Sequence, residues 1–278
     1  MSAATHIEAT KSPRSSIDGF GNVLVATDFT DGAKVALERA AGLPFAPGAQ
    51  VQLTHVVETA DPRAVVQRRL EEERQRLFEG SQARVLTSIL EGDVAPALAL
   101  RARHSRTELV VLGRHGTRSW REAVLGTTAH RVIRDGSTST LIVAPRAIGA
   151  YRRPLVAVDF SPSSTLALEL SARISAPGTP ICVVHVISPL DDVLVETTQL
   201  ERFLHGVELP ISWQPTVQIG DPAEQILEAA RQRDSDLIVV GSIGKGLVRR
   251  ALLGSVAERV MRGASCDVLV ARLPEVRM

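Results

Sequence analysis

The chain has 278 residues, which is room for one large domain or for two of ordinary size. It carries 32 Lys and Arg against 31 Asp and Glu, and only 3% of its residues are aromatic. This near-neutral charge and the scarcity of stacking side chains argue against nucleic acid or an anionic membrane surface as a partner. Two cysteines make no disulfide or metal framework, and we expect a cytoplasmic protein.

The first 20 residues are polar and lack the long apolar core of a secretory signal. Residues 1–20 are therefore predicted to be a flexible tail. No apolar run in the chain reaches the roughly 18 residues that a membrane helix needs, so no membrane span is expected.

Predicted strands and helices then alternate, and the alternation occurs twice. The strand-like apolar runs are residues 22–27, 51–57, 109–112 and 141–143, and then 154–158, 181–187, 237–240 and 268–271. The helical patterns are residues 32–41, 63–79 and 94–104, and then 163–174, 190–205 and 223–233, with a fourth helix of each half expected to begin near Thr127 and Ser255. Continuous apolar runs that alternate with helices are typical of an α/β fold with an open parallel sheet covered by helices on both faces.

Each half is thus expected to hold five strands and four helices, in domains at residues 21–147 and 153–273. Asp93 and Asp221 precede helical patterns, at the place of an N-cap. The connector between the halves is short, so we expect them to pack together. An open sheet has an exposed edge to cover, and the last strands, at 141–143 and 268–271, are candidates for that contact.

A glycine motif of the form Gly-x2-Gly-x9-Gly-[Ser/Thr] follows the fourth predicted strand of each half. Its two copies lie 128 residues apart (241 − 113) and consist of Gly113, Gly116, Gly126 and Thr127, and of Gly241, Gly244, Gly254 and Ser255. Glycines let a backbone approach a ligand closely, and a helix N-terminus favours phosphate. The motif therefore predicts an anion site in each half, where the hydroxyl of Thr127 or Ser255 could cap the helix and donate to a phosphate. A tight turn with an N-cap and no ligand is the alternative.

Asp28 and Asp159 end the first strand of each half. If strands 1 and 4 are neighbours, each aspartate shares a crevice with the glycine motif, because ligands bind beyond the carboxyl ends of parallel strands. These aspartates could contact a ribose hydroxyl, a metal or a phosphate-bound water, or merely start a turn. His55 and His185 lack partners at metal spacing and are interpreted as structural.

Basic residues in the two motif loops could reach phosphates or could be solvated charges. They are Arg114, His115, Arg118 and Arg121, and Lys245, Arg249 and Arg250.

These motifs resemble the universal stress protein family over residues 22–146 and 154–272. The resemblance implies a tandem member in which each half has a five-stranded parallel sheet of order 3-2-1-4-5 and the halves pack as an intramolecular pseudo-dimer. Family members with the glycine motif bind ATP, so ATP with Mg²⁺ is the implied cofactor. Nucleoside contacts are implied for Asp28 and Val57 in the first half and for Asp159 and Ile187 in the second.

The second half follows the family pattern more closely, because the first has less usual residues in its loop, Arg114, Ser119 and Trp120. The resemblance favours an ATP-binding regulatory protein of a stress response, with an unidentified protein partner and a homodimer as open possibilities. The alternatives are a slow ATPase or self-phosphorylating enzyme, and a scaffold without nucleotide turnover. No base beyond Asp28 or Asp159 is evident, so no catalytic residue is assigned and fast turnover is not expected.

Overall fold

The protein was analysed as a computed structural model, which describes residues 18–57, 62–114, 127–145, 149–209, 211–244 and 253–274. The predicted tail therefore lies almost wholly outside the described residues, as does most of each glycine-motif loop. None of the described helices combines the length and apolar character needed to cross a membrane.

Strands and helices alternate through both halves, as predicted. The elements of the N-terminal half are β1 (Phe20–Ala26), α1 (Asp31–Ala41), β2 (Phe45–Val57), α2 (Arg63–Phe78), β3 (Arg84–Glu91), α3 (Val94–His104), β4 (Leu109–Gly113), α4 (Thr127–Asp135) and β5 (Ser139–Val143). Those of the C-terminal half are β6 (Pro154–Val158), α5 (Pro162–Ile174), β7 (Ile181–Ile187), α6 (Val193–His205), β8 (Trp213–Ile219), α7 (Pro222–Gln232), β9 (Leu237–Gly241), α8 (Ser255–Gly263) and β10 (Asp267–Ala271).

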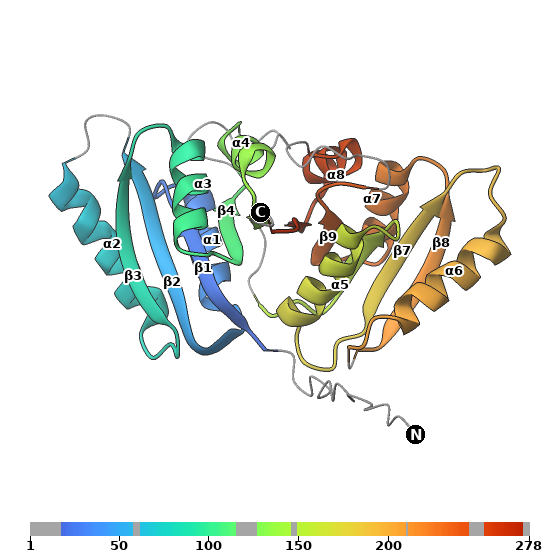
Figure 1. Ribbon diagram of the computed structural model, residues 1–278. Coiled ribbons are helices and arrows are strands. Elements are labelled where there is room, and N and C mark those ends of the chain that lie inside the picture. Colours follow the sequence, from blue (N-terminus) through green and yellow to red (C-terminus); the bar gives the residue numbers. More distant parts are fainter. Residues whose placement is uncertain are drawn as a thin grey trace, which may run out of the picture.

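Each half contributes five parallel strands in the predicted order, β3-β2-β1-β4-β5 and β8-β7-β6-β9-β10. The two sets are not separate sheets, however. Their edge strands β5 and β10 pair antiparallel, with Leu141 opposite Leu269, and this pairing makes one ten-stranded sheet that runs from β3 to β8 (Figure 1). The expected contact through the last strands is confirmed, because pairing satisfies the backbone groups that each open edge would otherwise expose.

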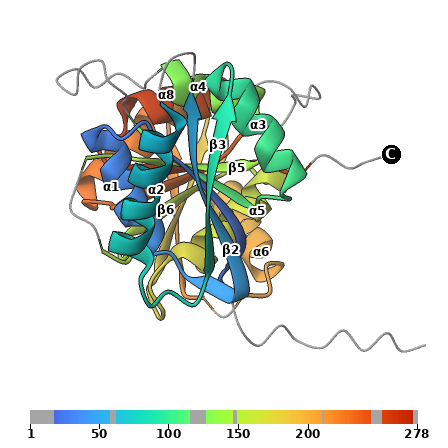
Figure 2. The same cartoon turned by 90° about the vertical axis from the view of Figure 1, so that its left-hand side faces the viewer.

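Helices cover both faces of the joined sheet, and each face has its own apolar core. Helices α1, α2, α5 and α6 lie on one face, and α3, α4, α7 and α8 lie on the other. Figure 2 looks onto the outer strand β3 and shows α2 and α3 on opposite sides of it. Strand residues serve the two cores alternately, as Val23 and Val25 do on one side and Leu24 on the other. Each core continues across the boundary between the halves.

A buried polar cluster fastens the halves beside the β5–β10 pair. The Asp267 carboxylate accepts from the Tyr151 hydroxyl at 2.6 Å and from the Ala144 amide at 2.8 Å, and it lies 2.9 Å from Nε of Arg39. The Arg39 guanidinium also lies over the Tyr151 ring, 4.4 Å from its centroid. Burial raises the pKa of Asp267, against the opposing effect of Arg39. Removal of either ionic partner would leave an uncompensated charge inside the protein.

Candidate functional site

A strained turn carries the predicted aspartate after the first strand of each half. The residues that follow Asp28 and Asp159 are Phe29 and Phe160, and both have a φ of 62°. A bulky side chain rarely adopts this left-handed conformation, which persists only where the surrounding structure holds it. This backbone conformation therefore sets the direction of the chain immediately after each aspartate, at the end of the strand.

The histidine of the next strand supports each of these turns. Nδ1 of His55 lies 2.7 Å from the carbonyl oxygen of Thr27, and Nδ1 of His185 lies 2.8 Å from that of Val158. Each ring also packs on the phenylalanine of its turn, with centroid distances of 4.8 Å in the N-terminal half and 4.4 Å in the C-terminal half. These contacts agree with the structural role predicted for both histidines.

Two serines hold the aspartate of the C-terminal half. Oδ1 of Asp159 accepts from the Ser164 hydroxyl at 2.6 Å and from the Ser161 amide at 3.1 Å. In return, the Asp159 amide donates to the Ser164 oxygen at 3.0 Å. Asp159 is half-buried and both serines are buried. Oδ1 of Asp159 therefore accepts two hydrogen bonds, one from the first turn of α5 and one from the residue that caps this helix.

The glycine motif of the C-terminal half meets this aspartate, as predicted. Strands β6 and β9 are neighbours, and a Cβ added to Gly244 would lie 2.6 Å from Oδ2 of Asp159. A Cβ on Gly241 would lie 2.8 Å from the Cβ of Ser163 at the start of α5. Gly244 therefore lets the backbone pack directly against a carboxylate, and Gly241 allows close packing of β9 on α5.

The first turn of α8 lies beside the meeting point of Gly244 and Asp159. Gly254 occupies the N-cap position, and its amide donates to the Ser242 carbonyl at 2.8 Å. Ser255 is the first helical residue and is exposed, and no side chain makes the N-cap hydrogen bond. The expectation that Ser255 caps this helix is therefore wrong, because the capping position belongs to the preceding glycine. A glycine there leaves the first helical amides without a side-chain cap, in the place where an anion gains from the helix dipole.

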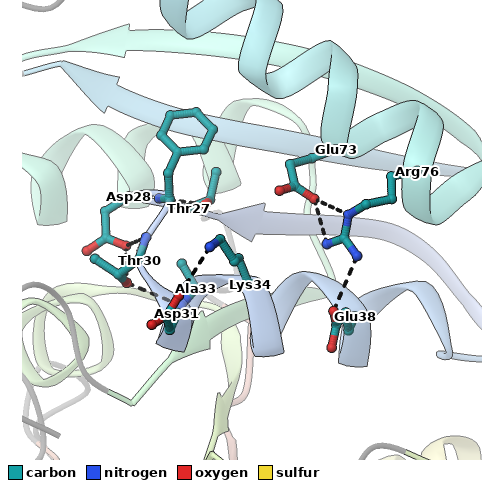
Figure 3. Close-up of polar contacts among 10 residues, drawn as sticks. Thr27, Asp28, Thr30, Asp31, Ala33, Lys34, Glu38, Glu73 and Arg76 are labelled. Carbon is teal, nitrogen blue, oxygen red and sulfur yellow. Dashed lines mark hydrogen bonds and ion pairs between the residues drawn. The ribbon is translucent and has the colours of Figure 1, made fainter.

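The aspartate of the N-terminal half is held more simply. Asp28 is exposed, and its Oδ1 accepts from the Thr30 amide at 3.0 Å and from the Thr30 hydroxyl at 2.5 Å (Figure 3). The Thr30 hydroxyl also caps α1 through the amide of Ala33. Ala33 stands where the C-terminal half has Ser164, since both lie five residues after the aspartate. Thr30 thus supplies to Asp28 both the hydroxyl and the amide donors that Ser164 and Ser161 supply to Asp159.

The glycine motif of the N-terminal half is only partly described. A Cβ on Gly113 would come 2.6 Å from the Gly32 carbonyl oxygen, so this glycine lets the end of β4 pack on α1. Gly116 and Gly126 lie outside the described residues. Thr127 begins α4, as predicted for the fourth helix of this half.

Arg114 lies away from any phosphate position, in the interface between the halves. Its guanidinium donates to carbonyl oxygens at the end of α8, to Met261 at 2.6 Å, to Arg262 at 3.1 Å and to Ala264. The side chain is buried, and this desolvation lowers the pKa of Arg114. For Arg114 the interpretation as a phosphate-reaching side chain is therefore wrong, because the carbonyls at the end of a helix attract a cation. The other basic residues of both loops lie outside the described residues.

Val57 and Ile187 end the second strand of each half, beside the aspartates. The carbonyl oxygen of Val57 accepts from the Gly92 amide at 3.2 Å, and that of Ile187 from the Gly220 amide at 3.0 Å. Both side chains are buried. Their contact with a nucleoside stays a prediction.

Ser164 is the residue at this site that the sequence patterns did not single out. The one feature of the sequence that could have identified Ser164 is its position, five residues after the aspartate and inside the first turn of the following helix. From the sequence it looks like an ordinary helical serine, because the contact forms only through the left-handed turn at Phe160.

The comparisons with known proteins agree with this architecture. A family model described as the universal stress protein family matches residues 19–144 and again residues 150–272. A universal stress protein of Mycobacterium bovis is 30% identical over 219 residues, which are 70% of this chain and 68% of that protein. A universal stress protein of Thermus aquaticus is 33% identical over 136 residues, and the match covers 44% of this chain and 99% of that protein.

The fold is also found in a solved structure. The crystal structure of a universal stress protein from Archaeoglobus fulgidus superposes with a TM-score of 0.66 and covers 90% of this chain and 98% of its own. Its 20% sequence identity supports likeness of fold. Because the family model matches both halves and the strand order repeats in both, the chain belongs to the universal stress protein family, as a member with two tandem domains.

Proposed function

We propose that this protein binds ATP in its C-terminal half and acts as a nucleotide-dependent regulator in a stress response. The observation that carries the proposal is the close approach of Gly244 to Oδ2 of Asp159, which brings the glycine motif against the strand-end aspartate in a way that a residue with a Cβ would not allow. The start of α8 lies beside this contact, where the Gly254 amide donates to the Ser242 carbonyl.

Three parts of the site have complementary chemistry for a nucleotide. The first amides of α8 and the exposed hydroxyl of Ser255 suit phosphate oxygens. The Asp159 carboxylate suits a hydroxyl donor such as ribose. The end of β7 at Ile187 offers an apolar wall for a base. This order of groups matches a nucleotide that lies across the carboxyl ends of the strands.

Magnesium would enter this site with the triphosphate. Within the described ranges, no three His, Cys, Asp or Glu side chains are placed to hold a metal ion. Mg²⁺ is commonly bound by substrate phosphates, several waters and one or two carboxylates, and Asp159 is the nearest carboxylate to Gly244 that the described contacts provide. The ion would supply charge neutralisation for the phosphates.

Regulation is favoured over turnover because the residues around Asp159 hold its carboxylate in one orientation. Phosphoryl transfer needs an oriented nucleophile and charge stabilisation on the γ-phosphate. Oδ1 of Asp159 is engaged by two donors from α5 and its entry turn, which suits a fixed acceptor better than a mobile base. Slow hydrolysis and a pure scaffold are the alternatives that measurement separates.

Calorimetric titration with ATP and Mg²⁺ tests the proposal. We expect binding, and a stabilisation of about 2.7 kcal/mol at a hundredfold excess over the dissociation constant. Gly244→Val together with Gly254→Val should abolish binding by the C-terminal half, because the first added side chain would collide with Asp159. Gly149→Val is the matched control, since an added Cβ there meets no atom within 4 Å.

Unchanged stoichiometry in the double variant would refute the assignment of the site. Absence of any ATP binding by the wild type would favour the scaffold. Phosphate release faster than about one per minute, against the 1–100 per second of typical kinases, would favour the enzymatic alternative.

A further inference from the structure

We propose that the outer corner of the C-terminal half is a docking surface for a basic amphipathic helix of a partner protein. The surface, called here the corner patch, consists of five large apolar residues that are exposed: Leu190, Val193, Leu194, Val195 and Ile219. This proposal does not depend on nucleotide binding, and it assigns a chemistry to the protein partner that the sequence leaves unidentified.

Exposed apolar side chains are concentrated in the corner patch. Leu190 is 95% exposed and Leu194 is 79% exposed. The other large apolar residues that are exposed in the described part of the chain are spread over α2, β3, α3 and the end of β10: Val65, Leu86, Leu100 and Leu273. A single exposed leucine is ordinary, whereas an apolar group with a polar rim is typical of an interaction site.

Two strand ends and one helix bring the patch together. Ile219 ends β8 and pairs in register with Ile187, the last residue of β7. Leu190 follows Ile187 by three residues, and α6 begins three residues later at Val193. The corner patch therefore covers the carboxyl ends of the two outermost strands and the first turn of α6, at the outer end of the sheet (Figure 1).

A hydrogen-bonded turn holds these leucines in solvent. The Ser188 amide donates to the Asp191 carboxylate at 2.8 Å, and the Asp191 amide donates to the Ser188 carbonyl at 3.0 Å. Asp192 caps α6 by accepting from the amides of Leu194 at 2.8 Å and Val195 at 3.4 Å. Because the backbone of the patch is already ordered, a partner that covers it would cost little further backbone entropy.

The same corner of the N-terminal half shows that the fold does not require an apolar surface there. Helix α2 begins with Arg63 where α6 begins with Val193, and β3 ends with Glu91 where β8 ends with Ile219. Arg63 and Glu91 form an exposed ion pair. An ordinary charged surface at this corner is thus compatible with the architecture, and the apolar residues of the C-terminal half call for another explanation.

Carboxylates around the corner patch indicate the chemistry of its occupant. The segment from Ser188 to Glu201 has no basic residue and four acidic ones, Asp191, Asp192, Glu196 and Glu201. Asp191, Asp192 and Glu201 are exposed, and Glu201 lies seven positions after Leu194, on the same face of α6. Asp221, two residues beyond Ile219, is paired with Arg259 and adds no net charge.

This acidic rim selects among possible occupants. An anionic membrane surface would be repelled, and two copies joined patch to patch would bring like charges together. A helix with lysine or arginine beside its apolar residues satisfies both parts of the surface, since its apolar side chains cover the leucines and its cations meet the carboxylates. The geometry and the charge therefore favour a basic amphipathic helix.

Two synthetic peptides of about four helical turns test this on the full-length protein. Both have leucines at helical spacing, and the other positions carry lysine in one peptide and glutamate in the other. By fluorescence anisotropy we expect the lysine peptide to bind about tenfold more tightly or better, with a difference that shrinks as salt rises. Leu190→Ser with Leu194→Ser should weaken the lysine peptide by about tenfold or more, because burial of each leucine contributes on this scale. Leu100→Ser, at an exposed leucine of α3, is the matched control and should bind like the wild type.

Asp191→Asn with Asp192→Asn separates charge from apolar contact. Asparagine keeps an oxygen for the turn and for the cap of α6, so the fold stays intact while the advantage of the lysine peptide falls several-fold. Equal affinity of the wild type for both peptides, or unchanged binding by the double serine variant, would overturn the proposal. Self-association in sedimentation, or binding to phosphatidylserine vesicles, that the double serine variant loses would also overturn it, in favour of a second copy or a membrane.

Discussion

The two halves have the same strand order, yet they use equivalent positions differently. Ser164 and Ser161 hold the half-buried aspartate of the C-terminal half, whereas Thr30 supplies both the amide and the hydroxyl donor to the exposed Asp28. At the first residue after the first motif glycine, the N-terminal half has Arg114, which reaches into the partner half, and the C-terminal half has the buried Ser242. The difference teaches that equivalent positions after the same strands can hold the aspartate through different side chains, and can either stay within one half or reach into the other. The predictions below test these differences. They begin with the joint, which comprises the buried cluster of Asp267, Arg39 and Tyr151 together with the contacts of Arg114 at the end of α8.

Loss of the buried carboxylate should have the largest effect. Asp267→Ala would leave the Arg39 guanidinium buried beside Tyr151 without its ionic partner, which typically costs about 3–5 kcal/mol. We expect this decrease in the free energy of unfolding by urea titration. Glu72→Ala, which removes an exposed helical partner of Arg68, is the control and should change little. Equal effects of the two variants would show that the cluster does not fasten the halves.

Arg114→Ser gives the N-terminal half the residue of its counterpart. The variant removes the donors to three carbonyl oxygens at the end of α8, and we expect a loss of about 2–3 kcal/mol in the free energy of unfolding. ATP affinity should stay the same, since the side chain faces the joint and not the ligand. Weaker ATP binding with unchanged stability would contradict this assignment and would indicate that Arg114 contacts the phosphates instead.

Alkaline pH should weaken the joint more gradually. Burial and the neighbouring Asp267 raise the pKa of Tyr151 well above its usual value near 10. A raised pKa in the folded state means that stability is intact below pH 10 and falls as pH rises further, by up to about 1.4 kcal/mol per unit. Because the chain has one tyrosine, absorbance at 295 nm reports its ionisation directly.

The phenolate signal should appear together with unfolding, not before it. Tyr151→Phe should reduce the slope of stability above pH 10, leaving the part contributed by the Cys182 thiol, whose pKa burial also raises. A phenolate that forms while the fold remains intact would contradict the buried position of this side chain.

The sequence predicted the fold largely because the inner strands are continuous apolar runs. Strands β6 and β7 were located to the residue, since both faces of each strand are covered. The outer strands β3 and β8 were expected but not located, because their residues are mostly half-buried and make no apolar run. The glycine motif predicted the meeting of Asp159 and Gly244, because topology brings strand ends together.

The sequence could not predict which side chains pair across the joint between the halves. Arg114 bonds residues about 150 positions away, and nothing in its local pattern distinguishes it from a phosphate ligand. Ser164 was missed for a related reason, since its partner depends on the left-handed turn at Phe160. Sequence patterns report the path of the backbone better than they report the direction of long or hydroxylated side chains.

The antiparallel pairing of β5 with β10 has an evolutionary consequence. The Thermus aquaticus relative is matched over 99% of its length by a stretch that covers 44% of this chain, so a single unit of this kind exists as a protein of its own. In an assembly of identical copies every substitution appears on both sides of the symmetry axis. Fusion into one polypeptide lifts that constraint, so that Arg114 can arise on one side and Ser164 on the other. Fusion thereby allows two repeats that share one sheet edge to specialise while both stay in the pair.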